Sequence, residues 1–171
     1  MRYRCSYNCC VDKSSPTPPK PNDLFDRETE WSRLAQFAAG SGHALAIVYG
    51  RRRQGKSFLL QALAEQAGGL YWEAAQQSRR QNLDSFAAQW ARWAGAPFAP
   101  RSDDWDALLE AIFAGRSGLV VIDEAGYLVE TAPEFPSLLQ RYFGRRSSAS
   151  GRGGLRVVLC GSVLVQMTKL V

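Results

Sequence analysis

The segment from Gly50 to Ser57 has the residue types and spacing needed to bind a phosphate chain. It reads Gly-Arg-Arg-Arg-Gln-Gly-Lys-Ser and fits the GxxxxGK[ST] (Walker A) pattern at every fixed position. Gly50 and Gly55 permit backbone angles that side chains hinder, so consecutive N–H groups can turn inward as an anion-binding nest. A helix starting near Lys56 would add its positive end. The Lys56 ammonium would contact the β- and γ-phosphates, and the Ser57 hydroxyl would ligate Mg²⁺.

The variable positions of this loop are basic. These arginines could add positive charge near the phosphates, but we expect at least two of the three to face solvent or pair with nearby acids. The nucleotide-binding set predicted from this segment is Gly50, Arg51, Arg52, Arg53, Gln54, Gly55, Lys56, Ser57 and Phe58.

A second acidic motif, Asp123-Glu124, follows the apolar run of residues 119–122. Ligands of a parallel sheet bind at the carboxyl ends of its strands, so these acids should lie beside the phosphate loop. Asp123 would hold Mg²⁺ opposite Ser57. Glu124 would orient a water molecule for attack on the γ-phosphate and accept its proton. We therefore predict Glu124 and Lys56 as catalytic residues, and Ser57 and Asp123 as metal ligands.

Other nucleotide-binding classes fit less well. Asp123-Glu124-Ala125-Gly126 also matches the DxxG signature of GTPases, but the chain contains no Asn-Lys-x-Asp element to recognise guanine. Small-molecule P-loop kinases need a substrate lid, and the sequence shows none. The predicted cofactors are therefore ATP and Mg²⁺.

Alternating strands and helices must position these motifs. Short apolar runs predict strands over residues 44–49, 70–74, 119–122 and 156–160. Helical spacing of apolar residues predicts helices near residues 31–38, 58–67, 83–93, 105–113 and 135–143, with Ser102 capping the fourth. This alternation is typical of an α/β fold with a mostly parallel sheet.

The composition is that of a soluble globular protein. Of the 171 residues, 46% are hydrophobic and 22% charged, the net charge is +5, and no apolar run is long enough to span a bilayer. We expect a cytoplasmic protein with no membrane partner. Residues 1–22, basic and rich in Pro and Ser, are predicted to form a disordered tail before a domain of residues 24–171. Cys5, Cys9 and Cys10 in this tail lack a nearby fourth zinc ligand.

Four stretches resemble a known family: residues 25–30, 48–57, 121–124 and 159–162. Together they are similar to the archaeal-type P-loop ATPases of the STAND/AAA-related class. The resemblance implies an ASCE-type three-layer sandwich. It also implies that Arg27 and Glu28, in a box matching the family's hhGRExE, help to bind the nucleotide, although Asp26 replaces the usual glycine. Ser162 would then sense the γ-phosphate as a third catalytic residue.

The resemblance also implies parts that this sequence does not show. The family's sheet has the order 5-1-4-3-2 and continues into a fifth strand, a helical lid and C-terminal domains. We therefore expect a chain truncated after the fourth core strand, with an unpaired edge on the strand of residues 44–49. Nucleic acid would be bound only through the missing domains, whereas a protein partner or homo-oligomer stays open.

Three functions are compatible with the sequence. The first is Mg²⁺-dependent ATP hydrolysis that drives a conformational switch. The second is a nucleotide-gated binding module with little hydrolysis, and the third is an inactive remnant that still binds ATP.

Overall fold

The computed structural model describes residues 2–7, 16–146 and 154–161. The strands are β1 (Arg2–Tyr7), β2 (Ala44–Tyr49), β3 (Leu70–Glu73), β4 (Gly118–Asp123) and β5 (Leu155–Gly161). The helices are α1 (Glu28–Ala39), α2 (Lys56–Gln66), α3 (Arg79–Ala94), α4 (Trp105–Ala114), α5 (Gly126–Thr131) and α6 (Phe135–Arg146). None of these helices is long and apolar enough to cross a membrane.

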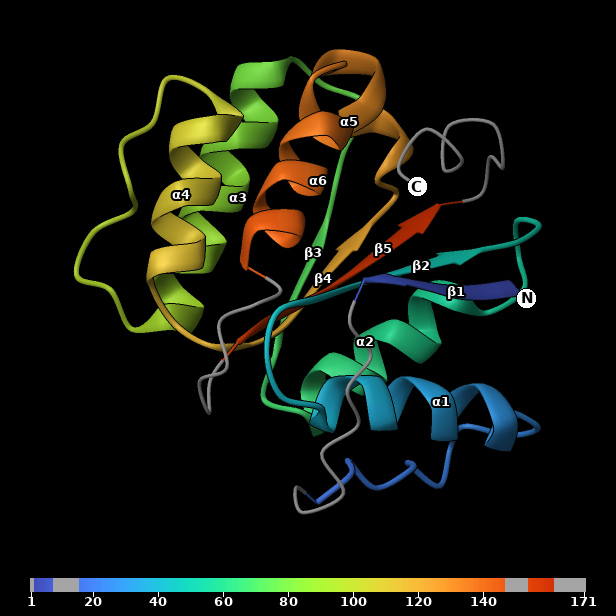
Figure 1. Cartoon of the computed structure of the whole chain (residues 1–171). Coiled ribbons are helices and arrows are strands. Elements are labelled where there is room, and N and C mark those ends of the chain that lie inside the picture. The colour runs from blue at the N-terminus through green and yellow to red at the C-terminus, as the bar shows by residue number, and fades with distance from the viewer. Residues whose placement is uncertain (1, 8–15, 147–153, 162–171) are drawn as a thin grey trace.

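The strands form one five-stranded sheet in the order β1-β2-β5-β4-β3 (Figure 1). β2, β5, β4 and β3 run parallel, which confirms the predicted mostly parallel sheet. β5 is buried along its whole length, and β2 and β4 are buried except at one terminal residue each. Helices cover both faces of these strands, which explains why their sequences are continuous apolar runs.

The amino-terminal residues differ from the expected disordered tail. Residues 2–7 form β1, which pairs antiparallel with β2 from Arg2 opposite Tyr49 to Tyr7 opposite Leu45. The edge of β2 that was expected to be unpaired is therefore covered within this chain. Residues 16–23 also have tertiary contacts, because the Trp31 indole N–H donates to the Pro18 carbonyl at 3.1 Å. The proposed division into residues 1–22 and 24–171 stays a prediction.

Two hydrophobic cores make the three-layer sandwich. α1 and α2 pack on one face, where their buried side chains meet Val48, Val121 and Val158 of the sheet (Figure 1). α3, α4, α5 and α6 cover the opposite face. There Trp72, Phe86, Trp105 and Phe135 form an aromatic cluster, with ring centroids 4.9 to 6.4 Å apart.

Ser102 was predicted to cap the helix that the structure shows as α4. This helix begins at Trp105, two residues later than a Ser102 cap would place it. Asp104 is the N-cap of α4, and its carboxylate accepts the Ala107 N–H at 2.9 Å. Ser102 was therefore the wrong cap, because the acidic residue closer to Trp105 has the extended backbone that an N-cap requires.

Candidate nucleotide-binding site

The phosphate loop connects β2 to α2 and contains two left-handed residues. Arg53 has φ = 61° and Gly55 has φ = 71°, whereas Gly50 has no positive φ. A Cβ atom built on Gly55 would meet no heavy atom within 4 Å, so the glycine is needed for its backbone angle and not for space. These left-handed residues turn the chain sharply just before the amino terminus of α2.

Lys56 lies inside this loop. Its side chain is buried, and Nζ donates to the carbonyl oxygens of Gly50 at 3.0 Å and Arg51 at 2.9 Å. The ammonium group is therefore held at the loop, in the position from which a lysine reaches terminal phosphates.

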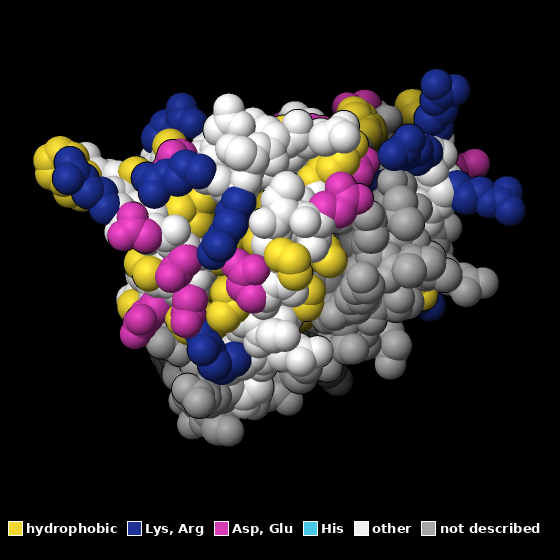
Figure 2. All heavy atoms as spheres, turned by 90° about the horizontal axis from the view of Figure 1, so that it is seen from above, with side chains coloured by type: hydrophobic (Ala, Val, Ile, Leu, Met, Phe, Trp, Pro, Cys, Tyr) yellow, Lys and Arg dark blue, Asp and Glu magenta, His cyan; other side chains and the backbone are white. Residues whose placement is uncertain are grey.

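The other side chains around the loop are mostly exposed. This group consists of Arg51, Arg52, Arg53, Ser57 and Phe58. Figure 2 shows the face of the molecule seen from above in Figure 1, where basic side chains project at the upper right margin and basic and acidic side chains are interspersed on the left.

Arg27 joins the start of α1 to the loop. Its guanidinium donates to the Gln54 carbonyl at 2.8 Å and pairs with Glu30 at 3.0 Å. Glu28 instead pairs with Lys20 at 2.8 Å, and this contact lowers the Glu28 pKa. Of the two residues predicted to help bind the nucleotide, Arg27 contacts the phosphate loop, whereas Glu28 contacts Lys20.

Asp26, which replaces the glycine of the family pattern, has a left-handed backbone. Its φ is 52°, in the left-handed region that aspartate tolerates better than most residues. Asp26 therefore stands at a position where glycine would be free of backbone strain.

Asp123 ends β4 with its side chain buried, and its carboxylate is held at both oxygens. The Tyr71 hydroxyl donates to Oδ2 at 2.8 Å, and the Glu124 N–H donates to Oδ1 at 2.8 Å. Burial alone would raise the Asp123 pKa, but hydrogen bonds from Ser57, Cys160, Tyr71 and the Glu124 backbone outweigh it and lower the pKa. Asp123 is therefore a carboxylate at neutral pH.

Glu124 is partly exposed and has an unusual backbone, with φ = 47°. Its pKa is raised, first by burial and then by the charge of Asp123, while Arg52 and Lys56 oppose the shift. A carboxyl group with a raised pKa near these cations is suited to accept a proton from water.

The donor set suits a magnesium ion. Mg²⁺ prefers oxygen ligands and is bound in proteins through one or two side chains plus waters and phosphates. Here the Ser57 hydroxyl lies near enough to the Asp123 carboxylate to lower its pKa, so two oxygen ligands from the two motifs lie close together. No group of three or more His, Cys, Asp or Glu residues with metal-site geometry occurs among residues 2–7, 16–146 and 154–161.

Ser162 lies outside the described residues, and its predicted role stays a prediction. Two partners of Asp123, Tyr71 and Cys160, were not predicted. They come from the neighbouring strands β3 and β5, so only the strand order brings them to the carboxylate.

The fold and site together define a class. Helices on both faces of a parallel sheet, a phosphate loop after β2 and an acidic pair after β4 form the P-loop NTPase fold of the ASCE type. The chain has this nucleotide-binding fold.

Three solved structures have a similar fold. Over 91% of its length the chain is similar to the Walker-type ATPase of Pyrococcus abyssi, with a TM-score of 0.63 and 20% identity. It is similar to the ORC2 protein of Aeropyrum pernix, solved in ADPNP–ADP complexes, over 97% of its length (TM-score 0.55, 20% identity). A third similar structure is Cdc6p from Pyrobaculum aerophilum, which matches 88% of this chain's length (TM-score 0.50, 16% identity).

The chain spans about half the length of these structures, since it covers 50%, 48% and 44% of them in the same order. No protein-family model matches the chain, and no curated protein matches it. At these identities the likeness establishes the fold.

Proposed function

We propose that this chain binds ATP with Mg²⁺ at the phosphate loop and hydrolyses it, and that hydrolysis drives a conformational switch. One observation carries the proposal: the Ser57 side chain of the first motif lies near enough to the Asp123 carboxylate of the second to lower its pKa, and the Lys56 ammonium is held in the same loop by the Gly50 carbonyl. Two motifs far apart in sequence thus meet where a triphosphate would need them.

The proposal assigns a role to each of these residues. The loop amides and Lys56 bind the phosphates, Ser57 and Asp123 hold the metal, and Arg27 supports the loop through Gln54. A bound Mg²⁺ would neutralise charge on the β- and γ-phosphates. Glu124 orients water and accepts its proton. The notion that Ser162 senses the γ-phosphate belongs to the same proposal.

A second candidate is a nucleotide-gated binding module with little hydrolysis. It is favoured by the Lys56 contacts, because Nζ must exchange the Gly50 and Arg51 carbonyls for phosphate oxygens when ATP enters. Binding alone would therefore alter the loop, without bond cleavage. We place either activity in the cytoplasm, with a protein partner or second copy as receiver of the switch.

Phosphate release separates the two candidates. We expect the wild-type chain to release phosphate from ATP, and Glu124→Gln to lose about 100-fold or more in rate while still binding ATP, because the proton acceptor is gone. Glu110→Gln, an exposed position on α4, serves as the matched control and should keep the wild-type rate. Equal slow release by wild type and Glu124→Gln, with ATP bound, would favour the binding module.

A further inference from the structure

Tyr71 reaches the metal side of the site from the edge of the sheet. β3 is the outermost strand next to β4, and Tyr71 lies opposite Val121, two residues before the Glu73–Asp123 pair. Its ring packs on the face covered by α1 and α2, the face on which Val121 is buried. From there the hydroxyl extends along the sheet to Asp123 Oδ2 at 2.8 Å.

The Tyr71 hydroxyl lies close to both predicted metal ligands. Besides its bond to Asp123, it lies near the Ser57 side chain, which affects the Tyr71 pKa. The other Asp123 oxygen, Oδ1, accepts the Glu124 N–H. Because the Tyr71 hydroxyl and the Glu124 N–H bind different oxygens, the carboxylate cannot rotate about its Cβ–Cγ bond without breaking both hydrogen bonds, so its plane is fixed before any metal arrives.

The Tyr71 side chain is partly buried on the core, and Tyr71 also lines an open groove between α2, β3 and α3 with a cavity volume of about 530 Å³. A phenol is protonated at neutral pH, so its hydroxyl can donate to the Asp123 carboxylate.

We infer that Tyr71 is a positioning residue of the magnesium site, which holds Asp123 in the orientation that a bound metal requires. The inference rests on the proposed function, because it concerns the same site. Tyr71 would touch neither the nucleotide nor the metal. Outer partners of metal ligands typically change metal affinity about 10- to 100-fold when they are removed.

The test is the magnesium dependence of ATP binding to Tyr71→Phe, measured by calorimetric titration over a series of Mg²⁺ concentrations and in EDTA. We expect the Mg²⁺ concentration for half-maximal effect to rise about 10-fold, because an outer-shell donor is lost. ATP affinity in EDTA should equal that of the wild type, because the phosphate loop is untouched.

The matched control is Tyr142→Phe. Its hydroxyl donates to the Asp106 carboxylate at 2.9 Å, the same kind of pair, but on α6 and α4. This variant should keep the wild-type magnesium midpoint. A second measurement compares Asp123→Ala with the double variant Tyr71→Phe/Asp123→Ala. Adding the tyrosine change to Asp123→Ala should not shift the magnesium midpoint further.

The outcomes are distinct. Wild-type protein that binds no ATP would contradict the proposed function, and the inference with it. Wild-type magnesium dependence that persists unchanged in Tyr71→Phe would overturn only the inference. An equal loss of ATP affinity with and without magnesium, or additive effects in the double variant, would also overturn it, because Tyr71 would then act on the fold.

Discussion

Two adjacent carboxyl groups have opposite pKa shifts at the end of β4. The Asp123 pKa is lowered, because the donors from Ser57, Cys160, Tyr71 and the Glu124 backbone outweigh burial, whereas burial and the neighbouring charge of Asp123 raise the Glu124 pKa. Environment thus separates a residue that stays ionised to hold a cation from one that can take up a proton. The dipeptide alone does not reveal this difference.

The raised pKa of Glu124 predicts how the rate of ATP hydrolysis declines at low pH. Since the folded-state pKa of Glu124 is raised above its usual 4.5, it protonates at higher pH than an ordinary glutamate. As pH falls, hydrolysis should decline with an apparent pKa above 4.5, measured by phosphate release between about pH 4 and 8. ATP binding should persist through this decline. A decline centred at or below 4.5 would contradict Glu124 as the proton acceptor.

The left-handed backbone of Asp26 allows a prediction of stability. Asp26→Gly should be neutral or slightly stabilising in chemical denaturation, because glycine adopts φ = 52° without strain. Asp26→Val should lower the free energy of unfolding by about 1–2 kcal/mol, because a β-branched residue is strained there. Asp23→Val, at a nearby exposed position without positive φ, is the control and should have little effect. Equal effects of the two valines would argue against backbone strain.

At the residue scale, sequence motifs predicted which side chains would meet, but not which side chains would support them. Lys56, Ser57 and Asp123 stand at fixed positions of local patterns, so their placement follows from the loop and the strand end. Tyr71 and Cys160 reach Asp123 across the sheet. Such contacts depend on strand order and register, which local patterns do not encode.

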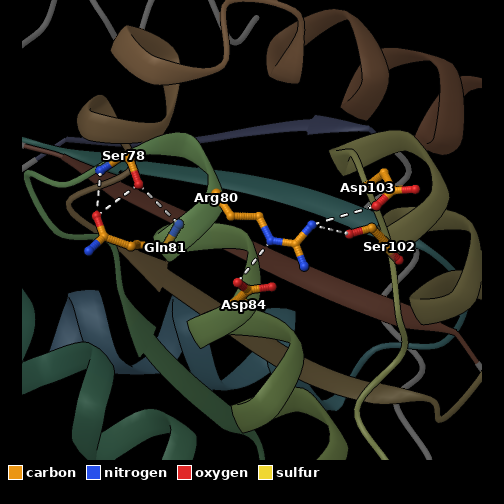
Figure 3. A network of polar contacts seen from close by, with 6 residues as sticks. All are labelled: Ser78, Arg80, Gln81, Asp84, Ser102 and Asp103. Carbon is orange, nitrogen blue, oxygen red and sulfur yellow. Dashed lines mark hydrogen bonds and ion pairs between the residues drawn. The ribbon is translucent and has the colours of Figure 1, made fainter.

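At the scale of elements, the amino terminus of α3 has well-defined local contacts. Ser78 and Gln81 form a reciprocal capping box, in which the Ser78 side chain accepts the Gln81 N–H and the Gln81 side chain accepts the Ser78 N–H (Figure 3). Beside it, Arg80 pairs with Asp84 of the next turn and with Asp103 before α4. The capping box thus fixes the start of α3, and Arg80 connects α3 with the segment before α4 through exposed contacts.

The cap and the ion pairs should contribute differently to stability. Ser78→Ala should lower the free energy of unfolding by about 1 kcal/mol, because an N-cap acceptor is lost. Arg80→Ala should change it little, because the guanidinium is exposed and exposed ion pairs contribute weakly. Chemical denaturation of both variants provides the measurement. A larger loss for Arg80→Ala than for Ser78→Ala would contradict this ranking.

Four strands and five helices agree with the sequence patterns, whereas β1 and α5 were not predicted. The buried strands are continuous apolar runs, and the longer helices have one apolar face. β1 contains polar residues and pairs with one neighbour only, so it lacks such a run. α5 has six residues, too few to show helical spacing.

At the scale of the whole molecule, the sheet edge next to β2 is the main departure from expectation. β1 covers this edge with an antiparallel ladder from Arg2 to Tyr7. An open edge on a strand as apolar as β2 would offer unpaired N–H and carbonyl groups to other chains. β1 therefore completes the sheet on the side of the strand that leads into the phosphate loop.

Removing β1 tests this role. A variant that begins at Asn8, behind a new initiator Met, keeps residues 16–23 and their contact with Trp31. It should melt at a lower temperature and self-associate at lower concentration, because the β2 edge is exposed. Light scattering and thermal unfolding are the measurements. An unchanged melting temperature with a monomeric variant would contradict a structural role for β1.

The central claim is that the loop around Lys56 binds the triphosphate of ATP, and direct calorimetric titration of ATP with Mg²⁺ tests it most directly. The wild-type chain should bind ATP, and Lys56→Ala should show no measurable binding while unfolding at a similar temperature. Lys20→Ala, which removes a lysine paired with Glu28 outside the loop, should bind like the wild type. Lys56→Ala with unchanged ATP affinity would contradict the account.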